Sequence, residues 1–173
     1  MPLETWLAYT LVTTTFLLIP GPTIILVISY SLLRGRQAVI ALVLGVGLGD
    51  LTAISLSFLG VGVLLQTVAT AFYLIKWLGA AYLIWLGIKM WSSASEFTDL
   101  DKKNRSHAWR EIFSSAYITT ALNPKSIVFF LAFIPQFIEP ELPFTTQMVI
   151  LGATFFVLAI ISVLGYAALA IYA

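Results

Sequence analysis

Two prolines and a glycine interrupt the first long apolar stretch of the chain, in the segment Ile19-Pro20-Gly21-Pro22-Thr23-Ile24-Ile25-Leu26. A second apolar stretch is interrupted in a similar way, in Ala121-Leu122-Asn123-Pro124-Lys125-Ser126-Ile127-Val128. When the two segments are set side by side, Pro22 falls against Pro124. Proline has no backbone N–H and its ring clashes with the preceding turn, so both helices should kink or break at these positions. The sequence therefore predicts a fold with two related, interrupted helices.

The composition indicates that these helices lie in a membrane. The 173 residues are 60% hydrophobic and only 10% charged, and the mean hydropathy is +1.00. A soluble domain usually carries about 25% charged residues, because its surface must face water. Charge is too scarce here to coat a soluble globule, so the lipid bilayer is the expected partner. The net charge of +1 is uninformative about nucleic-acid binding, and the sequence has no basic stripe with interleaved aromatics that would support it.

Five apolar stretches are each long enough to cross a bilayer core, which needs about 20 helical residues. They run over Trp6–Leu33, Val39–Leu65, Val68–Trp91, Ile112–Phe137 and Phe144–Tyr172. Lipid cannot pair with backbone polar groups, so only helices and closed barrels span it. The runs are continuous rather than alternating, which favours helices. We expect an all-α, polytopic membrane helix bundle formed by a single transmembrane domain, residues 1–173.

The one extended polar segment, residues 92–111, contains eight of the seventeen charged residues and is predicted to be a solvated loop. It would separate a first three-helix repeat, residues 1–91, from a second and incomplete repeat, residues 112–173. A broken helix at the start of each half is typical of an inverted-repeat transporter with its site between the repeats. That architecture has three plus three helices, so we expect five spans with the sixth apparently missing.

Lysine and arginine residues predict the orientation, because cytoplasmic connections carry an excess of them. Arg34 and Arg36 occupy the first connection, and the third connection carries most of the others. The fourth connection has only Glu139 and Glu141. The first connection and the 92–111 loop are therefore predicted to be cytoplasmic, with the N-terminus outside.

The two breaks are candidates for a substrate site. A break at membrane depth frees backbone groups that are tolerated only in protein or around a water-filled cavity. The half-helix that follows each break presents free amides and a partial positive charge, which suit a carboxylate. The candidate substrate-binding residues are Gly21, Pro22, Thr23, Asn123 and Lys125, and the residues that make the breaks are Pro20, Pro22 and Pro124. The alternative is a pair of ordinary proline kinks relieved by neighbouring groups.

Two ionisable residues fall inside predicted spans, Asp50 in the second and Lys125 in the fourth. A charge inside a membrane costs at least a few kcal/mol, so it normally faces the bundle interior with a partner or a function. Asp50 is the candidate proton-coupling residue, or it would bind the ammonium group of the substrate. Lys125 would then bind the carboxylate group of the same substrate. The alternative is a structural ion pair between the two, or Lys125 reaching toward an interface.

Other motifs narrow the range of functions. Gly45 and Gly49 form a small-xxx-small pair, which lets helices approach closely, so helix packing is their expected role. Gly47-Leu48-Gly49-Asp50 matches the GxGD signature of intramembrane aspartyl proteases, but that chemistry needs a second carboxylate and no span has one. The only histidine, His107, lies in the polar loop and cysteine is absent, so we expect no metal site and no catalytic triad. No enzyme activity and no cofactor are predicted.

Four segments resemble the LysE/RhtB-type family of amino-acid exporters, in the family's order and spacing. They are the broken first span with its basic turn, the glycine-rich second span, the third span and the fourth span: Ile19–Arg36, Ala41–Asp50, Lys76–Lys89 and Leu122–Phe137. The residues that match the family's motifs are Pro20, Gly21, Pro22, Gly45, Gly49, Asn123, Pro124 and Lys125. The resemblance does not fix a residue type at Asp50, whose role rests on the physical argument alone.

The resemblance implies a secondary transporter of the bacterial inner membrane that exports amino acids or their derivatives from the cytoplasm, driven by protons. The expected partners are lipid, a small polar substrate and protons. Family members typically continue through a sixth span, and a homodimer is one way in which this chain would complete the bundle. Two alternatives stay open: an inorganic-ion exporter of related architecture, and a non-transporting membrane subunit or truncated remnant.

Overall fold

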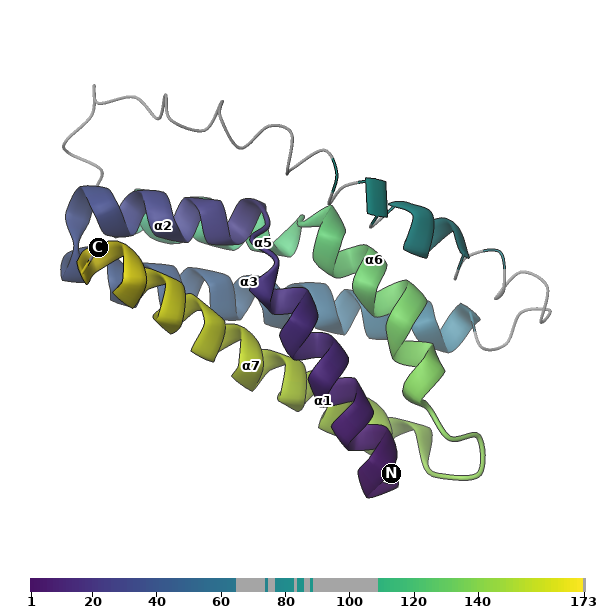
Figure 1. Ribbon diagram of the computed structural model, residues 1–173. Helices are drawn as coiled ribbons and strands as arrows, with labels where there is room; N and C mark the ends of the chain where they lie inside the picture. The colour runs from purple at the N-terminus through teal and green to yellow at the C-terminus, as the bar shows by residue number, and fades with distance from the viewer. Residues whose placement is uncertain (65–73, 75–76, 83, 86–87, 89–108, 173) are drawn as a thin grey trace.

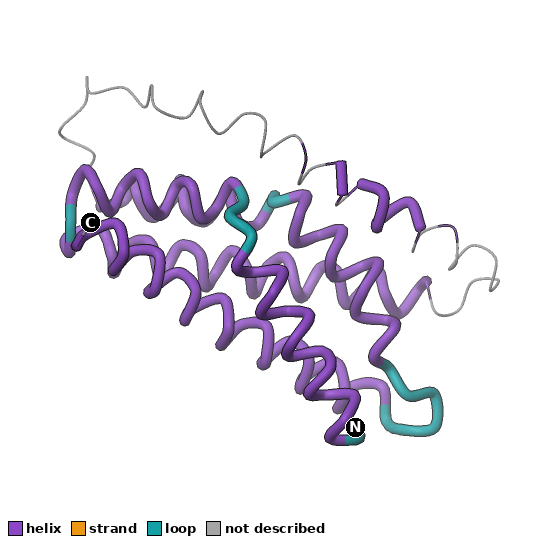
Figure 2. The backbone as a smooth tube through the Cα atoms, viewed as in Figure 1, coloured by secondary structure: helices purple, strands orange, loops and turns teal. Residues whose placement is uncertain are grey.

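The structure is a computed structural model that describes residues 1–64, 74, 77–82, 84–85, 88 and 109–172. No strand occurs in these ranges, so the predicted all-α fold is confirmed for them. The helices are α1 (Leu3–Leu18), α2 (Pro22–Arg34), α3 (Arg36–Leu64), α5 (Trp109–Ala121), α6 (Pro124–Phe133), the 3-10 helix η2 (Ile134–Phe137) and α7 (Phe144–Tyr172). Figure 2 shows the short loops at which the first and second predicted breaks interrupt the helical tube.

Within the described residues, three helical spans are long and apolar enough to cross a membrane: Arg36–Gly60, Trp109–Phe137 and Phe144–Tyr172. Helices α1 and α2, which meet at an angle of 54°, make a fourth if they are taken as one broken span. The predicted third span, Val68–Trp91, lies largely outside the described residues, as does the 92–108 part of the predicted loop.

The last residues of the predicted polar loop are helical rather than irregular. Helix α5 already begins at Trp109, three positions before the predicted span at Ile112. The indole of Trp109 stacks on Phe113 one turn later, with ring centroids 5.4 Å apart. Arg110 and Glu111, which hydropathy alone assigned to the loop, are therefore helical.

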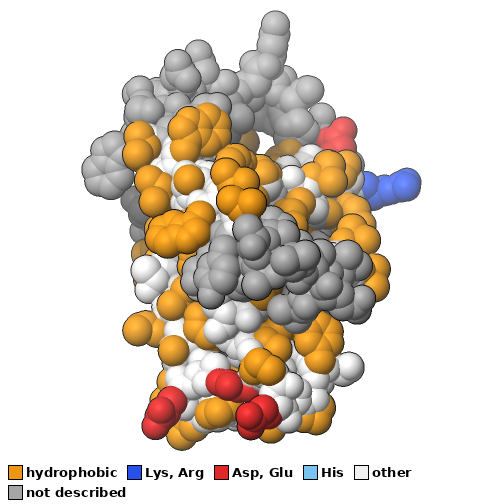
Figure 3. Space-filling view, turned by 90° about the vertical axis from the view of Figure 1, so that its right-hand side faces the viewer, with side chains coloured by type: hydrophobic (Ala, Val, Ile, Leu, Met, Phe, Trp, Pro, Cys, Tyr) orange, Lys and Arg blue, Asp and Glu red, His pale blue; other side chains and the backbone are white. Residues whose placement is uncertain are grey.

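The outer surface of the described bundle is dominated by apolar side chains, as the space-filling view in Figure 3 shows. Leu59, for example, is 72% exposed. A continuous apolar surface of this kind suits hydrocarbon rather than water. In Figure 3 acidic side chains gather at the lower edge of the view, and another acidic side chain lies at the upper right near a basic one.

Polar contacts mark the two ends of the bundle (Figure 1). At one end, Arg36 at the start of α3 donates a hydrogen bond to the hydroxyl of Tyr172 at the end of α7. At the other end, Thr5 near the start of α1 donates to Glu139 in the α6–α7 connection, over 3.2 Å. The bundle therefore has a basic turn at one end and an acidic connection at the other.

Two buried apolar clusters hold the helices together. One joins α1 to α6 and contains the edge-to-face pair of Phe130 and Phe155, whose ring centroids are 4.6 Å apart. The other joins α2 to α5 and contains Val27 and Leu42. Helices α3 and α7 are unbroken and contribute to both clusters. Each interrupted helix thus places one half in each cluster, and the breaks lie between the two.

Helices α3 and α5 approach closely at two glycines. A Cβ atom on Gly45 would lie 2.6 Å from the carbonyl oxygen of Phe113 and 2.7 Å from the Cβ of Ala116. On Gly49 it would lie 2.7 Å from the Cβ of Thr120. These separations are shorter than van der Waals contact, so a side chain at either position would push the helices apart. The close approach brings the end of α5 beside the segment of α3 that carries Asp50.

Candidate functional site

The first break separates α1 from α2 at residues 19–21. Ile19 and Gly21 both have extended backbone, with φ of −81° and −111° respectively. Pro22 is the first residue of α2, where the missing N–H would have no intrahelical partner anyway. Gly21 is the N-cap and offers no side-chain oxygen, so the first turn of α2 has no side-chain cap. The positive end of this half-helix is left without a local anion or acceptor.

The free carbonyl groups at the end of α1 are satisfied by side chains from distant helices. The Nζ of Lys125 donates to the carbonyl oxygen of Phe16 at 2.9 Å and also to that of Ile19. The hydroxyl of Tyr166, in α7, donates to the carbonyl oxygen of Leu18 at 2.7 Å. An ammonium group suits this position because the carboxyl end of a helix carries partial negative charge.

At the second break, the start of α6 is capped by Asn123, the residue that directly precedes this helix. Asn123 has extended backbone, and its side-chain oxygen accepts a hydrogen bond from the backbone N–H of Lys125 at 3.0 Å. Pro124 is the first residue of α6, in the position that Pro22 has in α2. An asparagine N-cap of this kind satisfies one of the orphan amides of the helix start.

The two breaks touch each other. The side-chain nitrogen of Asn123 donates to the hydroxyl oxygen of Thr23 at 3.2 Å. The hydroxyls of Thr23 and Thr120 are 3.3 Å apart and share a further hydrogen bond. All three side chains are buried. A polar network therefore connects the start of α2 with the end of α5 and the start of α6.

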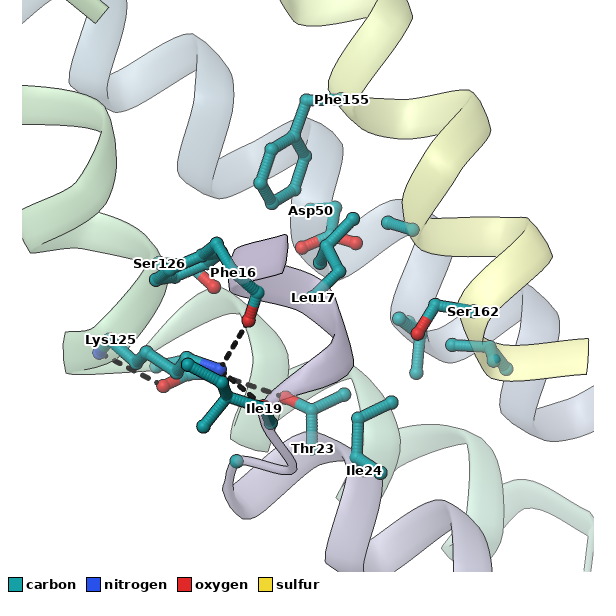
Figure 4. A pocket seen from close by; sticks show the side chains of 15 residues that line it. Phe16, Leu17, Ile19, Thr23, Ile24, Asp50, Lys125, Ser126, Phe155 and Ser162 are labelled. Carbon is teal, nitrogen blue, oxygen red and sulfur yellow. Dashed lines mark hydrogen bonds between the residues drawn. The ribbon is translucent and has the colours of Figure 1, made fainter. Parts of the chain in front are cut away.

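A small cavity of about 40 Å³ lies at this junction, shown in Figure 4. It has room for about three water molecules. Its polar lining comes from α2, α3, α6, α7 and the two breaks: Gly21, Thr23, Asp50, Asn123, Lys125, Ser126 and Ser162. The rings of Pro20, Pro22 and Pro124 are exposed and are absent from the lining. Four of the five candidate substrate-binding residues thus line one cavity, together with Asp50.

Asp50 and Lys125 enter the cavity from different helices. Asp50 is 3% exposed and Lys125 is 8% exposed. Within the described residues they form no ion pair with each other, because the Lys125 ammonium is engaged by the α1 carbonyls. That ammonium also lies 4.3 Å from the centroid of the Phe16 ring, a cation–π contact. The structural ion pair that the sequence left open as an alternative is not formed in this conformation.

Sequence reasoning missed several polar groups of the site. Thr120 lies one turn before Asn123, so it shares a helix face with the break, and this spacing was a usable signal. Tyr166 and Ser162 lie on α7, which has no break and no local sign of a site. The Ser162 hydroxyl oxygen is buried without a hydrogen-bond partner among the described residues.

Comparisons with known proteins cover the region that contains both breaks. The sequence profile of the LysE type translocator family matches residues 14–172. A homoserine/homoserine lactone efflux protein of Salmonella typhimurium is 39% identical over 170 residues, which is 98% of this chain and 82% of the relative. A protein of the same name from Salmonella typhi is also 39% identical over 170 residues, with the same coverage. An uncharacterized membrane protein of Vibrio cholerae is 38% identical over 172 residues, 98% of this chain and 82% of the relative. No solved structure matches.

Proposed function

This chain belongs to the LysE type translocator family, and on that premise we propose that it exports amino acids or amino-acid derivatives across the bacterial inner membrane. The names of two relatives, for homoserine and homoserine lactone efflux, support a small polar amino acid as the substrate class. The observation that carries the proposal is the cavity at the junction of the two breaks, which has an acid and a base in its lining. A zwitterionic amino acid needs one group of each sign.

The substrate's charged groups have complementary sites in this cavity. Its ammonium would bind the Asp50 carboxylate, which has no hydrogen-bond or ion-pair partner in the described part of the chain. Its carboxylate would bind the uncapped first turn of α2, where Gly21 and Thr23 line the cavity. The Lys125 ammonium is within the same cavity and would complete the carboxylate site.

Binding the carboxylate would loosen the first break. Lys125 now donates to the carbonyls of Phe16 and Ile19, and a substrate carboxylate would compete for the same ammonium. Charge-assisted hydrogen bonds of this kind contribute about 1.5–3 kcal/mol each, so the exchange is close to balanced and therefore reversible. The end of α1 would lose part of its cap when substrate binds, and regain it on release.

The transport cycle follows from this exchange. The cavity of about 40 Å³ is smaller than an amino acid, so it would have to widen to admit the substrate. The α1–α6 and α2–α5 clusters would move relative to each other about the breaks, with α3 and α7 as the continuous elements. Alternating exposure of a midplane site between two such halves is the general mechanism of broken-helix transporters. Asp50 would alternate between the substrate ammonium and the coupling proton.

We also propose an inverted repeat for the helix bundle and an orientation for it in the membrane. Helices α2 and α6 each begin with proline after an extended N-cap, which supports an inverted repeat with halves at residues 1–91 and 112–173. The basic turn at Arg34 and Arg36 supports a cytoplasmic location for that end of the bundle and for the 92–111 loop, with the N-terminus outside. Five spans in the full chain and a homodimer stay predictions.

The test is transport in proteoliposomes loaded with homoserine, with and without an imposed proton gradient. The wild type should release homoserine faster when protons can flow inward, and Asp50→Asn should abolish this acceleration. Glu141→Gln is the matched control, because it removes an exposed carboxylate in the α6–α7 connection and should leave transport unchanged. Unaltered proton-driven release from the Asp50→Asn protein would refute the coupling role.

A further inference from the structure

Ser162, on α7, lines the central cavity, and its buried hydroxyl oxygen has no hydrogen-bond partner among the described residues. Hydroxyl groups inside helices can donate to the carbonyl oxygen four residues earlier. Thr154, on the same helix, does so at 2.8 Å. Ser29 on α2 and Thr52 on α3 do so at 2.7 and 2.8 Å. Ser162 forms no such bond with its own helix, so its hydroxyl is left to bond to a molecule in the cavity.

Two other buried hydroxyls in the described part of the chain lack a partner, those of Thr13 and Ser31. Neither residue lines the central cavity. A buried hydroxyl without a partner is unfavourable, because it has given up its hydrogen bonds to water. At Ser162 a bound molecule can supply the missing partner, since the space beside this side chain is the same one that Asp50 and Lys125 line.

The α7 wall of the cavity is otherwise apolar. Helix α7 contributes four residues to the lining: Phe155, Ala159, Ser162 and Val163. Only Ser162 among them carries a polar side chain. Figure 4 shows Ser162 and Lys125 at opposite sides of the cavity, with Asp50 between them in this view. A substrate whose carboxylate lies toward Lys125 and whose ammonium lies on Asp50 would therefore point its side chain toward α7.

We propose that Ser162 binds the side-chain hydroxyl of the transported amino acid, and that the chain thereby selects hydroxyl-bearing amino acids over apolar ones of the same length. The inference rests on the proposed function and specifies its substrate class. An apolar wall with a single hydroxyl matches a short side chain that ends in a hydroxyl, because such a side chain has both apolar carbon and a hydrogen-bonding oxygen. The cavity has room for about three water molecules, so one small substrate can reach both Asp50 and Ser162.

The experiment compares the efflux of homoserine from proteoliposomes with that of norvaline, which has a methyl group in place of the hydroxyl. The wild type should have the lower KM for homoserine, because a site that bonds to a substrate hydroxyl rejects the analogue without it. Ser162→Ala should raise the KM for homoserine roughly fivefold, as expected for one lost neutral hydrogen bond, and leave that for norvaline unchanged. Ser162→Thr keeps the hydroxyl and should retain the preference. Ser31→Ala is the matched control, since it removes an unpartnered buried hydroxyl outside the cavity and should change neither KM.

Other outcomes would overturn the inference. If Ser162→Ala raises both KM values equally, Ser162 supports the packing of the bundle and not the substrate side chain. If Ser162→Ala changes neither value, the hydroxyl is satisfied by water in the cavity. If the wild type moves homoserine and norvaline with equal KM, the selectivity fails while the export function stands, and this comparison needs no variant. If the folded wild type moves no amino acid, the proposed function itself fails.

Discussion

At the first break the groups that satisfy the backbone come from distant helices, whereas at the second they come from the next residues in the chain. The end of α1 depends on Lys125 and Tyr166, which are more than a hundred residues away. The start of α6 depends on Asn123, which directly precedes it. The first break therefore depends on how distant helices pack, whereas the cap at the second break does not. We infer that the first break is the movable one.

The backbone explains why the two breaks differ in shape. Around the first break, Pro20 and Pro22 remove two donors within three residues, and α1 and α2 meet at 54°. Before the second break, Leu122 and Asn123 still donate to carbonyl groups of α5, at 3.0 and 3.1 Å. Only Pro124 lacks a donor there, and residues 109–137 still count as one membrane-length span. The bend of more than 40° occurs at the break that has lost two donors.

Among the variants that test this comparison of the two breaks, Lys125→Met should have the largest effect. It removes two charge-assisted hydrogen bonds from the α1 carbonyls, and we expect a loss of about 3 kcal/mol in unfolding free energy together with loss of transport. Hydrogen exchange should rise at residues 16–25, around the first break, and stay close to wild type at residues 126–133. Lys125→Arg, which keeps the charge, should restore part of the protection. Equal increases at both breaks would contradict the proposed asymmetry.

Gly49→Ala tests whether the two breaks depend on the α3–α5 contact. The new methyl group would lie 2.7 Å from the Cβ of Thr120, whose hydroxyl contacts Thr23 at the first break. We expect overpacking to cost about 1–3 kcal/mol in unfolding free energy and to reduce transport. Gly165→Ala is the control, because its Cβ meets nothing within 4 Å and it should be nearly neutral. A stable, active Gly49→Ala protein would show that the contact is looser than described.

Asn123 variants separate the local cap from the contact between the breaks. Asn123→Ala removes both, and we expect about 1 kcal/mol of destabilisation from the lost cap. Asn123→Asp keeps the acceptor for the Lys125 N–H and loses the donor to Thr23. Denaturant unfolding should rank Asn123→Asp between the wild type and Asn123→Ala. If Asn123→Asp is as unstable as Asn123→Ala, the contact between breaks matters more than the cap.

Tyr166→Phe should have the smallest effect. It removes one neutral hydrogen bond, the one to the Leu18 carbonyl. We expect a cost of about 1 kcal/mol or less and transport within twofold of wild type. Thermal unfolding in detergent is a sufficient measurement. A loss as large as that of Lys125→Met would mean that the Tyr166 hydroxyl, and not the lysine, holds the first break.

A large part of the fold followed from the sequence. The scarcity of charge and the length of the apolar runs indicate membrane helices, because lipid leaves the backbone no other way to pair. The prolines predicted where helices end, since a missing N–H interrupts the ladder wherever the chain is packed. Asp50 and Lys125 were identifiable as site candidates because a charge within an apolar span needs a reason.

Only the tertiary structure decided which groups meet. The sequence offered an Asp50–Lys125 ion pair as the simple alternative, and the structure places the lysine on the carbonyls of Phe16 and Ile19 instead. It also brings Ser162 and Tyr166 to the site from a helix that has no break. Local patterns fix where a backbone donor is missing, because that is a property of one residue and its neighbours. Which side chain supplies the replacement depends on helix crossings between residues far apart in the chain, and no local pattern contains them.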